Sequence, residues 1–324
     1  MYSLLAQEDE KNKSSIVKSS FITPVSYQTI AFVCGKDIHD STSIRAKFIQ
    51  HCTDNHIEIT PFLAEDAVEK EPFGLDYLTQ EKVIASFSGA IVIAVESFGS
   101  ACELGTFSYV DSMAKKIYIL DEAENLENDS FIKCGPIEKI NRLAGRDSHL
   151  FSFGPSPTTK IPVTQEEAFT NCANAISVKS TLTRDTISIK DDTLCVNNLY
   201  WLRVALLELS ALLSRTTMNE IKTILLHLYS CDHLALKFDK ETSMIRDDDV
   251  DPYLDLLINF SSKLHLLTRD SSGIIISNPL NKFPFSSDSK NNSVLFKTDF
   301  ANSSSYKRIL SRRLLYLRRR HRVA

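Results

Sequence analysis

Short apolar runs alternate with helix-length amphipathic stretches through the first half of this 324-residue chain. In one run, Ala90–Val95, every residue is hydrophobic, which is typical of a strand buried on both faces of a sheet. Parallel strands need long, usually helical connections, so this alternation indicates an α/β fold with a doubly wound parallel sheet. The predicted strands are Thr29–Cys34, Ile57–Phe62, Ala90–Val95, Ile117–Leu120 and Leu150–Phe153.

The predicted sheet domain ends at a proline-rich break. Of the nine glycines, which supply tight turns, only Gly273 follows the break GPSPTTKIP at residues 154–162. We therefore expect an N-terminal extension over residues 1–28 and the sheet domain over 29–157. Residues 158–198 are predicted to be a connector that includes one helical stretch.

A second domain is predicted over residues 199–282. Three helical patterns there are followed by two short strand patterns joined by a turn, which is the outline of a winged helix-turn-helix. An all-helical packing domain with an incidental hairpin fits the same pattern, so both alternatives stay open. The helices are Leu199–Leu213, Thr217–Tyr229 and Pro252–Leu267, and the strands are Leu266–Arg269 and Ile274–Ser277.

The last segment, residues 283–324, is predicted to be a linker followed by a basic tail. Tyr306–Ala324 contains eight of the 37 lysine and arginine residues and none of the 41 acidic ones, so 29 basic residues face 41 acids elsewhere. A basic arm on an acidic body most often contacts phosphates, and we expect it to bind nucleic acid; folding back on the body is the alternative. The arginines expected at the contact are Arg312, Arg313, Arg318, Arg319, Arg320 and Arg322.

Composition and cysteine spacing argue against several other classes. The chain is 43% hydrophobic and 24% charged, as in soluble globular proteins, and none of its apolar runs approaches the about 20 residues that a membrane span needs. The charged opening segment lacks the apolar core of a secretion signal. Seven cysteines without a C-x-x-C pair or zinc-type spacing indicate reduced thiols in a cytoplasmic protein with no metal site.

Two loops carry the candidate chemistry, and both leave the predicted sheet at strand ends. In an open parallel sheet, ligands bind beyond the carboxyl ends of the strands where the chain order reverses, commonly between the first and third strands. Residues 34–37 leave the first strand, and residues 96–105 leave the third and enter a helix. Gly99 permits a tight turn there, and Ser100 is placed as the helix N-cap, so that the first-turn amides can bind an anion or a sugar hydroxyl.

Glu103 is predicted to be the third residue of that helix. A capping box with Ser100 is the structural alternative, in which the carboxylate only satisfies a backbone donor. Two observations favour a chemical role: Glu96 supplies a second carboxylate at the strand end, and Gly105 is a poor helix residue that suggests close approach by another backbone or a ligand. The positive end of the helix favours an ionised Glu103, and paired carboxylates can cleave glycosidic bonds.

A set of short motifs between about residues 30 and 140 points to one family. The motifs are Phe32-Val33-Cys34-Gly35, Arg45, Glu65-Asp66, Glu81, Glu96-Ser97, Gly99-Ser100, Glu103-Leu104-Gly105, Phe107-Ser108, Ser130-Phe131-Ile132 and Gly135-Pro136. They resemble the nucleoside 2-deoxyribosyltransferases, and more specifically the deoxyribosyltransferase-like effectors encoded beside bacterial retron reverse transcriptases. The resemblance implies a Rossmann-type, deoxyribosyltransferase-like domain followed by a mostly helical, winged-helix-like domain.

The resemblance also implies roles for individual residues. Glu103 would be the glycosyl-accepting nucleophile, and Glu96 would bind the sugar hydroxyls. Ser100 would contact an oxygen or a phosphate, and Arg45 with Lys36 would clamp a phosphate, unless Arg45 is an ordinary surface arginine. The other residues expected at the substrate site are Cys34, Gly35, Glu81, Ser97 and Gly99.

The implied activity is that of a toxin-like N-glycosidase that cleaves the base–ribose bond of a nucleotide in defence against phage, with NAD as substrate rather than cofactor. The retron reverse transcriptase and its RNA-linked single-stranded DNA (msDNA) would hold it in check, and a homodimer or larger assembly is expected. The sequence departs from the transferases at Ser88-Gly89-Ala90, where they carry an Asp, and at Glu96, which is Asp in them; both differences favour hydrolysis of a substrate with a good leaving group. A nucleotide-sensing, nucleic-acid-binding regulatory subunit and a scaffold without catalysis are the alternatives.

Overall fold

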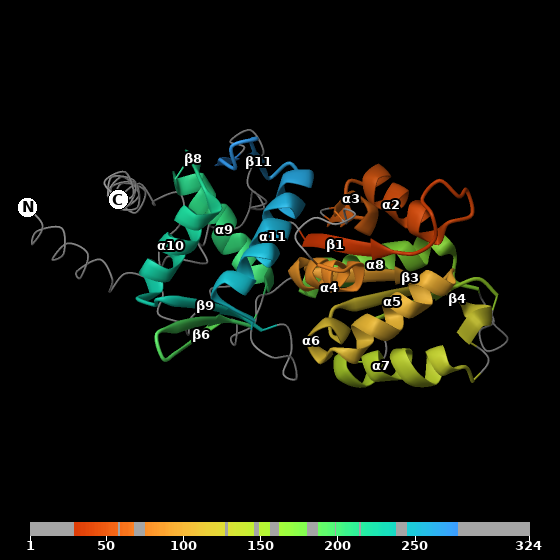
Figure 1. Cartoon of the computed structure of the whole chain (residues 1–324). Helices are drawn as coiled ribbons and strands as arrows, with labels where there is room; N and C mark the ends of the chain where they lie inside the picture. Colours follow the sequence, from red (N-terminus) through yellow and green to blue (C-terminus); the bar gives the residue numbers. More distant parts are fainter. Residues whose placement is uncertain are drawn as a thin grey trace, which may run out of the picture. The chain divides into compact units, whose positions relative to one another are not determined.

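The computed structural model describes residues 29–57, 59–67, 75–126, 129–145, 149–155, 162–179, 187–197, 199–213, 215–237 and 245–277. Two compact units emerge: a sheet unit, which ends at residue 180, and a second unit, which contains the described residues from 187 onward (Figure 1). The predicted N-terminal extension, linker and basic tail lie outside the described residues. No helix within the described ranges is long and apolar enough to cross a lipid bilayer.

The sheet unit is built on five parallel strands in the order β2-β1-β3-β4-β5. All five predicted strands are confirmed, with ends that differ by at most two residues. The chain order reverses between β1 and β3, which pair from Ala31–Ala90 to Cys34–Ile93, so the two loops predicted to carry the site leave neighbouring strands. The strands are β1 (Thr29–Cys34), β2 (Ile59–Phe62), β3 (Ala90–Ala94), β4 (Ile117–Glu122) and β5 (Leu150–Phe153).

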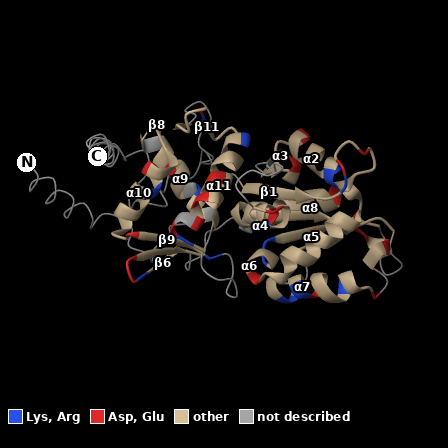
Figure 2. Ribbon diagram, in the orientation of Figure 1, with Lys and Arg blue, Asp and Glu red and all other residues tan. Residues whose placement is uncertain are grey.

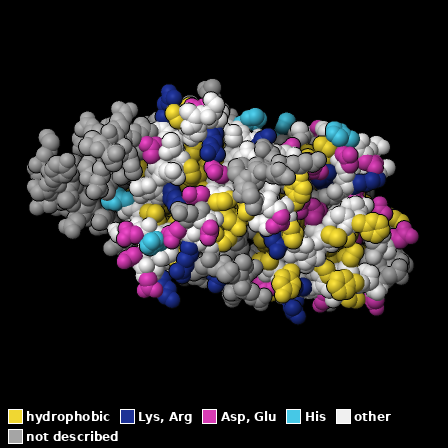
Figure 3. All heavy atoms as spheres, viewed as in Figure 1, with side chains coloured by type: hydrophobic (Ala, Val, Ile, Leu, Met, Phe, Trp, Pro, Cys, Tyr) yellow, Lys and Arg dark blue, Asp and Glu magenta, His cyan; other side chains and the backbone are white. Residues whose placement is uncertain are grey.

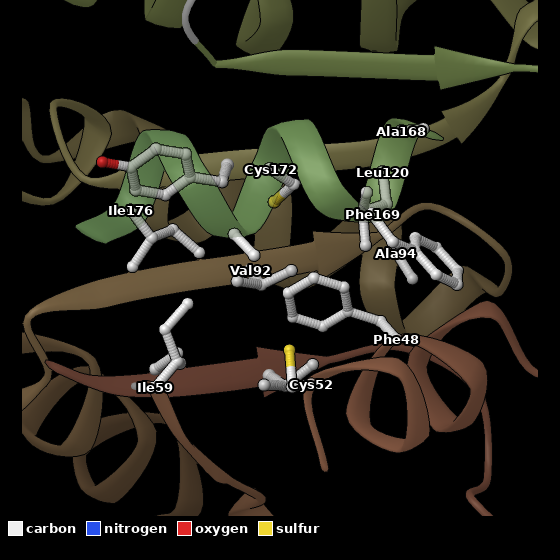
Figure 4. Packing of buried hydrophobic residues seen from close by; sticks show 14 of the residues in the cluster. Phe48, Cys52, Ile59, Val92, Ala94, Leu120, Ala168, Phe169, Cys172 and Ile176 are labelled. Carbon is white, nitrogen blue, oxygen red and sulfur yellow. The ribbon is translucent and has the colours of Figure 1, made fainter. Parts of the chain in front are cut away.

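Helices cover both faces of this sheet. On one face lie α2 (Ile44–Asp54) and α8 (Gln165–Lys179), and Figure 4 shows Phe48 and Cys172 of these helices pointing toward Val92 of β3. On the other face lies α5 (Phe98–Tyr109), and Figure 1 shows α4 and α7 on the same side. The other helical elements of the unit are α3 (Ala64–Ala67), α4 (Tyr77–Phe87), α6 (Asp111–Ala114), the 3-10 turn η1 (Ala123–Leu126), the π-helix η2 (Lys133–Ile137) and α7 (Glu138–Ala144).

The helix α8 belongs to the sheet unit, although the sequence analysis places its residues in the connector. Phe169, Cys172 and Ile176 recur at helical spacing and are buried against the sheet. The hydrophobic core therefore continues past the proline-rich break at residues 154–162.

The second unit combines helices with two sheets, so the all-helical alternative is wrong. Its sheets have the strand orders β10-β9-β7-β6 and β11-β12-β8. The three predicted helices and the final antiparallel hairpin are confirmed. A further hairpin, β6–β7, lies within the predicted connector. The elements are β6 (Ile187–Lys190), β7 (Thr193–Val196), α9 (Leu199–Leu213), β8 (Arg215–Thr216), α10 (Met218–Tyr229), β9 (His233–Leu236), β10 (Ile245–Arg246), η4 (Asp247–Val250), α11 (Asp251–Lys263), β11 (Leu267–Arg269) and β12 (Ile275–Ser277).

Candidate functional site

The carboxylate of Glu96 lies where the sequence analysis places it, just beyond β3, but protein donors already surround it. Its Oε1 accepts hydrogen bonds from the Lys36 amide at 2.9 Å and the Arg45 amide at 3.2 Å, and the Ser43 hydroxyl donates to it at 3.2 Å. Its Oε2 accepts from the Ile44 amide at 2.6 Å. Glu96 therefore satisfies the amides at the start of α2, as a capping anion would. Both oxygens that were predicted to bind sugar hydroxyls already accept hydrogen bonds from the protein.

Gly35 makes this contact sterically feasible. A Cβ atom at Gly35 would lie 2.7 Å from Oε1 of Glu96 and 2.8 Å from Cβ of Arg45, both closer than atoms can pack. The predicted substrate-site residues Gly35 and Lys36 thus form the tight loop around Glu96. The Lys36 ammonium forms an ion pair with Asp40 and donates to the Thr42 hydroxyl at 3.2 Å.

The helix α5 begins earlier than the sequence suggested. Ser97 is its N-cap, with its hydroxyl accepting from the Ser100 amide at 3.1 Å, while the Ser100 hydroxyl accepts from the Ser97 amide at 3.0 Å. The prediction of Ser100 as the N-cap is therefore wrong, because the Ser-x-x-Ser pattern offers two caps and the first is used. Glu103 consequently lies in the second helical turn, out of reach of a capping box with Ser100.

Glu103 lies in a largely buried environment that opposes its charge. Burial, followed by the charges of Glu81 and Glu65, raises the pKa of Glu103 to about 7, against the opposing effects of the Arg45 guanidinium and a hydrogen bond with the Cys34 thiol. Burial therefore opposes the ionisation that the positive end of the helix was expected to favour, and Glu103 lies in the second turn, where the effect of the helix dipole falls off. Near neutral pH the carboxyl group exists in both protonation states.

Glu65, Glu81 and Glu103, which we name the carboxylate cluster, come from α3, α4 and α5. Burial, and then the charge of Glu65, raises the pKa of Glu81. Arg45 of α2 is buried, and its Nη2 and Nη1 atoms donate to the Glu65 oxygens at 2.9 and 3.3 Å. Arg45 is thus no surface arginine, and the two Nη groups expected to clamp a phosphate are paired with Glu65. Its buried Nε has no hydrogen-bond partner within the described residues.

Two glycines of α5 border open space. Gly99 lies four residues before Glu103 on the same side of the helix, and a Cβ there would meet only the Ser97 hydroxyl, at 3.7 Å. A Cβ at Gly105 would meet no described atom within 4 Å, so the close backbone approach expected there is not found within the described chain.

Sequence reasoning assigned no role to two features of this sheet edge. One is Glu65 as the partner of Arg45, a pairing of residues that lie 20 positions apart. The other is Asp121, which is buried at the end of β4. The side-chain amide of Asn125 and the backbone amide of Glu122 each donate a hydrogen bond to its carboxylate at 2.8 Å. Burial raises the pKa of Asp121 to about 6. Its position directly after the apolar run IYIL, like that of Glu96 after AIVIAV, is the signal that could have identified it. Within the described residues, no group of three His, Cys, Asp or Glu side chains is arranged to hold a metal ion.

Comparison with known proteins places this chain in a family. Residues 41–263, which span both units, match the family described as STM3845 retron effector protein. An Escherichia coli protein named "Retron Ec73 putative ribosyltransferase/DNA-binding protein" is 23% identical over 157 residues, 44% of this chain and 50% of that protein. A second, "Retron Ec86 putative ribosyltransferase/DNA-binding protein", is 25% identical over 131 residues, 40% of this chain and 42% of that protein. The matched region therefore spans half or less of each curated relative. Because the family match covers more than half of its residues, this chain belongs to the STM3845 retron effector protein family.

Proposed function

We propose that this retron effector is an N-glycosidase that hydrolyses the base–ribose bond of a nucleotide, with NAD as the first candidate substrate. The observation that carries the proposal is Glu103, a carboxyl group in the second turn of the helix that follows β3. Glu103 does not cap that helix, and burial and the charge of Glu81 raise its pKa to about 7. A group of this kind supplies both a nucleophile and a proton-binding site near neutral pH. The printed names of the two relatives include ribosyltransferase, which supports the same chemistry.

The reaction would proceed in two displacements. In the first, an ionised oxygen of Glu103 bonds to C1′ of the ribose while the bond from C1′ to the base nitrogen breaks and its electron pair leaves with the base. Nicotinamide carries a positive charge in NAD and leaves as a neutral molecule, so this step needs no acid. In the second, a water oxygen replaces Glu103 at C1′, and the proton released by water goes to a nearby carboxylate.

Glu81, rather than Glu96, would supply the second carboxylate. The oxygens of Glu96 are occupied by donors from the loop before α2 and from α2 itself, whereas the charge of Glu81 acts directly on Glu103. We assign Glu96 to positioning α2, with Arg45 in its first turn, and Glu81 to stabilising the cationic sugar and accepting the proton of water.

Nicotinamide release from NAD by the purified full-length chain tests this assignment. Glu103→Gln keeps the shape but removes the nucleophile, and we expect turnover to fall by at least about 100-fold. Asp111→Asn, which alters a carboxylate paired with Lys139 beyond the far end of α5, should keep wild-type turnover. Equal turnover by Glu103→Gln and the wild type would refute the proposal. A panel of nucleosides and nucleotides would identify the base if NAD is not cleaved.

A second candidate role, nucleic-acid binding in regulation, is favoured by the topology of the second unit. Helix α9, strand β8, helix α10, helix α11 and the β11–β12 hairpin occur in the chain order of a winged helix-turn-helix, with the sheet order β11-β12-β8, although β9, β10 and η4 lie between α10 and α11. The relatives' names include DNA-binding. Helix α11, the one that would enter a groove, is acidic (Figure 2): Asp251 pairs with Lys222 at 2.6 Å and Asp255 with Arg269 at 2.8 Å. We therefore assign the phosphate contacts to the basic tail, whose residues lie outside the described ranges.

The proposed partners are the retron reverse transcriptase, its msDNA and further copies of this chain, in the cytoplasm. The family match supports the retron association, and the seven cysteines, all free thiols, suit a reducing compartment. Three aromatic side chains of the sheet unit, Phe98, Tyr109 and Phe131, are 96, 73 and 85% exposed, and Figure 3 shows hydrophobic side chains gathered over α5 and α7. Exposed apolar surface of this kind favours assembly.

A further inference from the structure

The ion pair between Arg45 and Glu65 joins a buried cation to an exposed anion. The Arg45 side chain is 4% exposed, whereas the Glu65 side chain is 60% exposed. Two hydrogen bonds connect them, from Nη2 of Arg45 to Oε1 of Glu65 at 2.9 Å and from Nη1 to Oε2 at 3.3 Å. The edge of the guanidinium that carries both Nη groups is therefore covered by a side chain that lies mostly in solvent.

The protein holds Arg45 more firmly than it holds Glu65. The Arg45 amide donates to Oε1 of Glu96 at 3.2 Å, and a Cβ at Gly35 would lie only 2.8 Å from Cβ of Arg45, so the base of this side chain is tightly packed. Glu65 belongs to α3, a helix of four residues, and within the described ranges its carboxylate is bound to Arg45 alone. Water competes well for an exposed partner of this kind. Glu65 is therefore the partner that can leave while Arg45 stays in place.

A phosphate group can take the place of the Glu65 carboxylate. The planar guanidinium donates two parallel hydrogen bonds to a carboxylate or to a phosphate with the same geometry. A buried cation without a counter-ion is costly, so Glu65 can neutralise Arg45 until an anion of the substrate replaces it. Glu65 follows β2 and Arg45 lies in the first turn after the β1 loop, at the carboxyl ends of two paired strands. The charge of Arg45 also acts on Glu103, so the exchange would take place beside the candidate nucleophile.

We propose that Glu65 is a displaceable counter-ion of Arg45: a phosphate group of the substrate replaces it on the two Nη groups, so that the site selects phosphorylated nucleotides over nucleosides. The selectivity for nucleotides rests on the proposed function, whereas the exchange at Arg45 does not. No covalent bond changes in this step. Two hydrogen bonds from Arg45 to Glu65 are replaced by two to phosphate oxygens, and the Glu65 carboxylate turns into solvent.

Calorimetric titration of two ligands that differ by one phosphate, nicotinamide mononucleotide and nicotinamide riboside, tests this selectivity. The full chain with Glu103→Gln is the common background, so that neither ligand is cleaved during the titration. In this background the mononucleotide should bind more tightly than the riboside. Adding Glu65→Gln keeps the size of the side chain but removes its charge, so the affinity for the mononucleotide should rise roughly tenfold while that for the riboside stays unchanged.

Asp66→Asn is the matched control for Glu65→Gln. It removes the same charge from the next residue of α3, which is also exposed. Because Asp66 is not bound to Arg45, its loss should change the affinity for the mononucleotide by less than about twofold. An equal gain in Asp66→Asn would reduce the effect to general charge repulsion and overturn the proposal.

Carbon-13 NMR of the Glu65 carboxyl group follows the exchange itself in the chain with native Glu65. The signal is assigned by its loss in Glu65→Asp, a variant that keeps the charge. Saturating mononucleotide should move the signal toward that of a glutamate in solvent, and the riboside should leave it in place. A signal that does not move when the mononucleotide binds would show that the ion pair is permanent and would overturn the proposal.

The remaining outcomes are equally decisive. No gain for the mononucleotide in Glu65→Gln, an equal gain for the riboside, or no binding of the mononucleotide to any of these chains would each count against the exchange. Nicotinamide release by the chain with native Glu103 separates the two claims. Equal release from both ligands would support the N-glycosidase without the selectivity, whereas exchange at Arg45 without any base release would support the counter-ion and count against the N-glycosidase.

Discussion

At the scale of single residues, the proposed reaction depends on the protonation state of Glu103. Burial and the neighbouring Glu81 bring its pKa to about 7, so a small change in pH alters the fraction of molecules in which Glu103 is ionised. If Glu103 attacks C1′, only the ionised form is active. We therefore expect kcat/KM for base release to rise tenfold per pH unit below about pH 7 and to level above it.

A pH–rate profile between pH 5 and 9 checks this sign. Glu81→Gln removes a negative charge that raises the pKa of Glu103, and should move the rising limb to lower pH whatever its effect on the maximal rate. Asp111→Asn, remote from the carboxylate cluster, should leave the limb in place. If kcat/KM instead falls as the pH rises through 7, Glu103 acts as a general acid.

The protonation of Glu103 also affects the free energy of unfolding. The pKa of Glu103 is raised in the folded protein above its ordinary value of 4.5. Folding is therefore not penalised below about pH 4.5, the penalty grows between about pH 4.5 and 7, and it stays constant above that range. Glu103→Gln should therefore stabilise the protein at pH 8 by about 2 to 3 kcal/mol and by much less at pH 5. Urea unfolding at both pH values tests this, and an equal effect at the two would contradict the assigned pKa.

At the scale of elements, Glu96 joins the end of β3 to the start of α2. It accepts hydrogen bonds from three backbone amides and one hydroxyl, so Glu96→Ala should leave several half-buried donors unpaired. We expect a loss of about 2 to 3 kcal/mol in unfolding free energy. Glu122→Ala, which removes an exposed acid at the end of β4, should cost less than about 0.5 kcal/mol. Urea unfolding of both variants compares them; equal stabilities would leave Glu96 free for a substrate.

At Gly105 of α5, by contrast, we expect a substitution that stabilises the protein. No described atom lies within 4 Å of the Cβ that alanine would add, and glycine within a helix costs about 0.5 to 1 kcal/mol relative to alanine. Gly105→Ala should therefore raise the unfolding free energy by that amount in denaturant titrations. Destabilisation would reveal that a part of the chain outside the described residues occupies the space.

The strands and the site differ in how far the sequence predicts them. Apolar runs such as Ala90–Val95 located the inner strands β1, β3 and β4, because burial on both faces requires such runs. The edge strands β2 and β5 are only partly buried, and their shorter runs were still sufficient to locate them. The role of Glu96 could not be predicted, since its donors lie 51 to 60 positions earlier in the chain. Either serine of Ser97-x-x-Ser100 can cap a helix, so the first residue of α5 was ambiguous. Strand β7 was missed because its hairpin with β6 is short and largely polar, although β7 itself is buried.

At the scale of the whole molecule, charge is unevenly distributed: the tail is basic and the rest of the chain is acidic. Tyr306–Ala324 carries eight positive charges and no acid, and each contacted phosphate of a single strand contributes about 0.7 to the slope of log affinity against log salt. If the tail makes the contact, a chain ending at residue 305 should bind single-stranded DNA more weakly, with a slope shallower by at most about six. Fluorescence anisotropy between 50 and 300 mM salt measures both quantities.

A full-length variant with all eight basic tail residues changed to glutamine separates charge from chain length, and it should behave like the truncated chain. If the slope of log affinity against log salt were unchanged in both variants, we would assign the DNA contact to the second unit, despite the acidic residues of α11. Unchanged DNA binding together with lower stability would instead indicate that the tail neutralises the acidic body. The two readings of the basic tail therefore differ in which quantity the same charges control, DNA affinity or unfolding free energy.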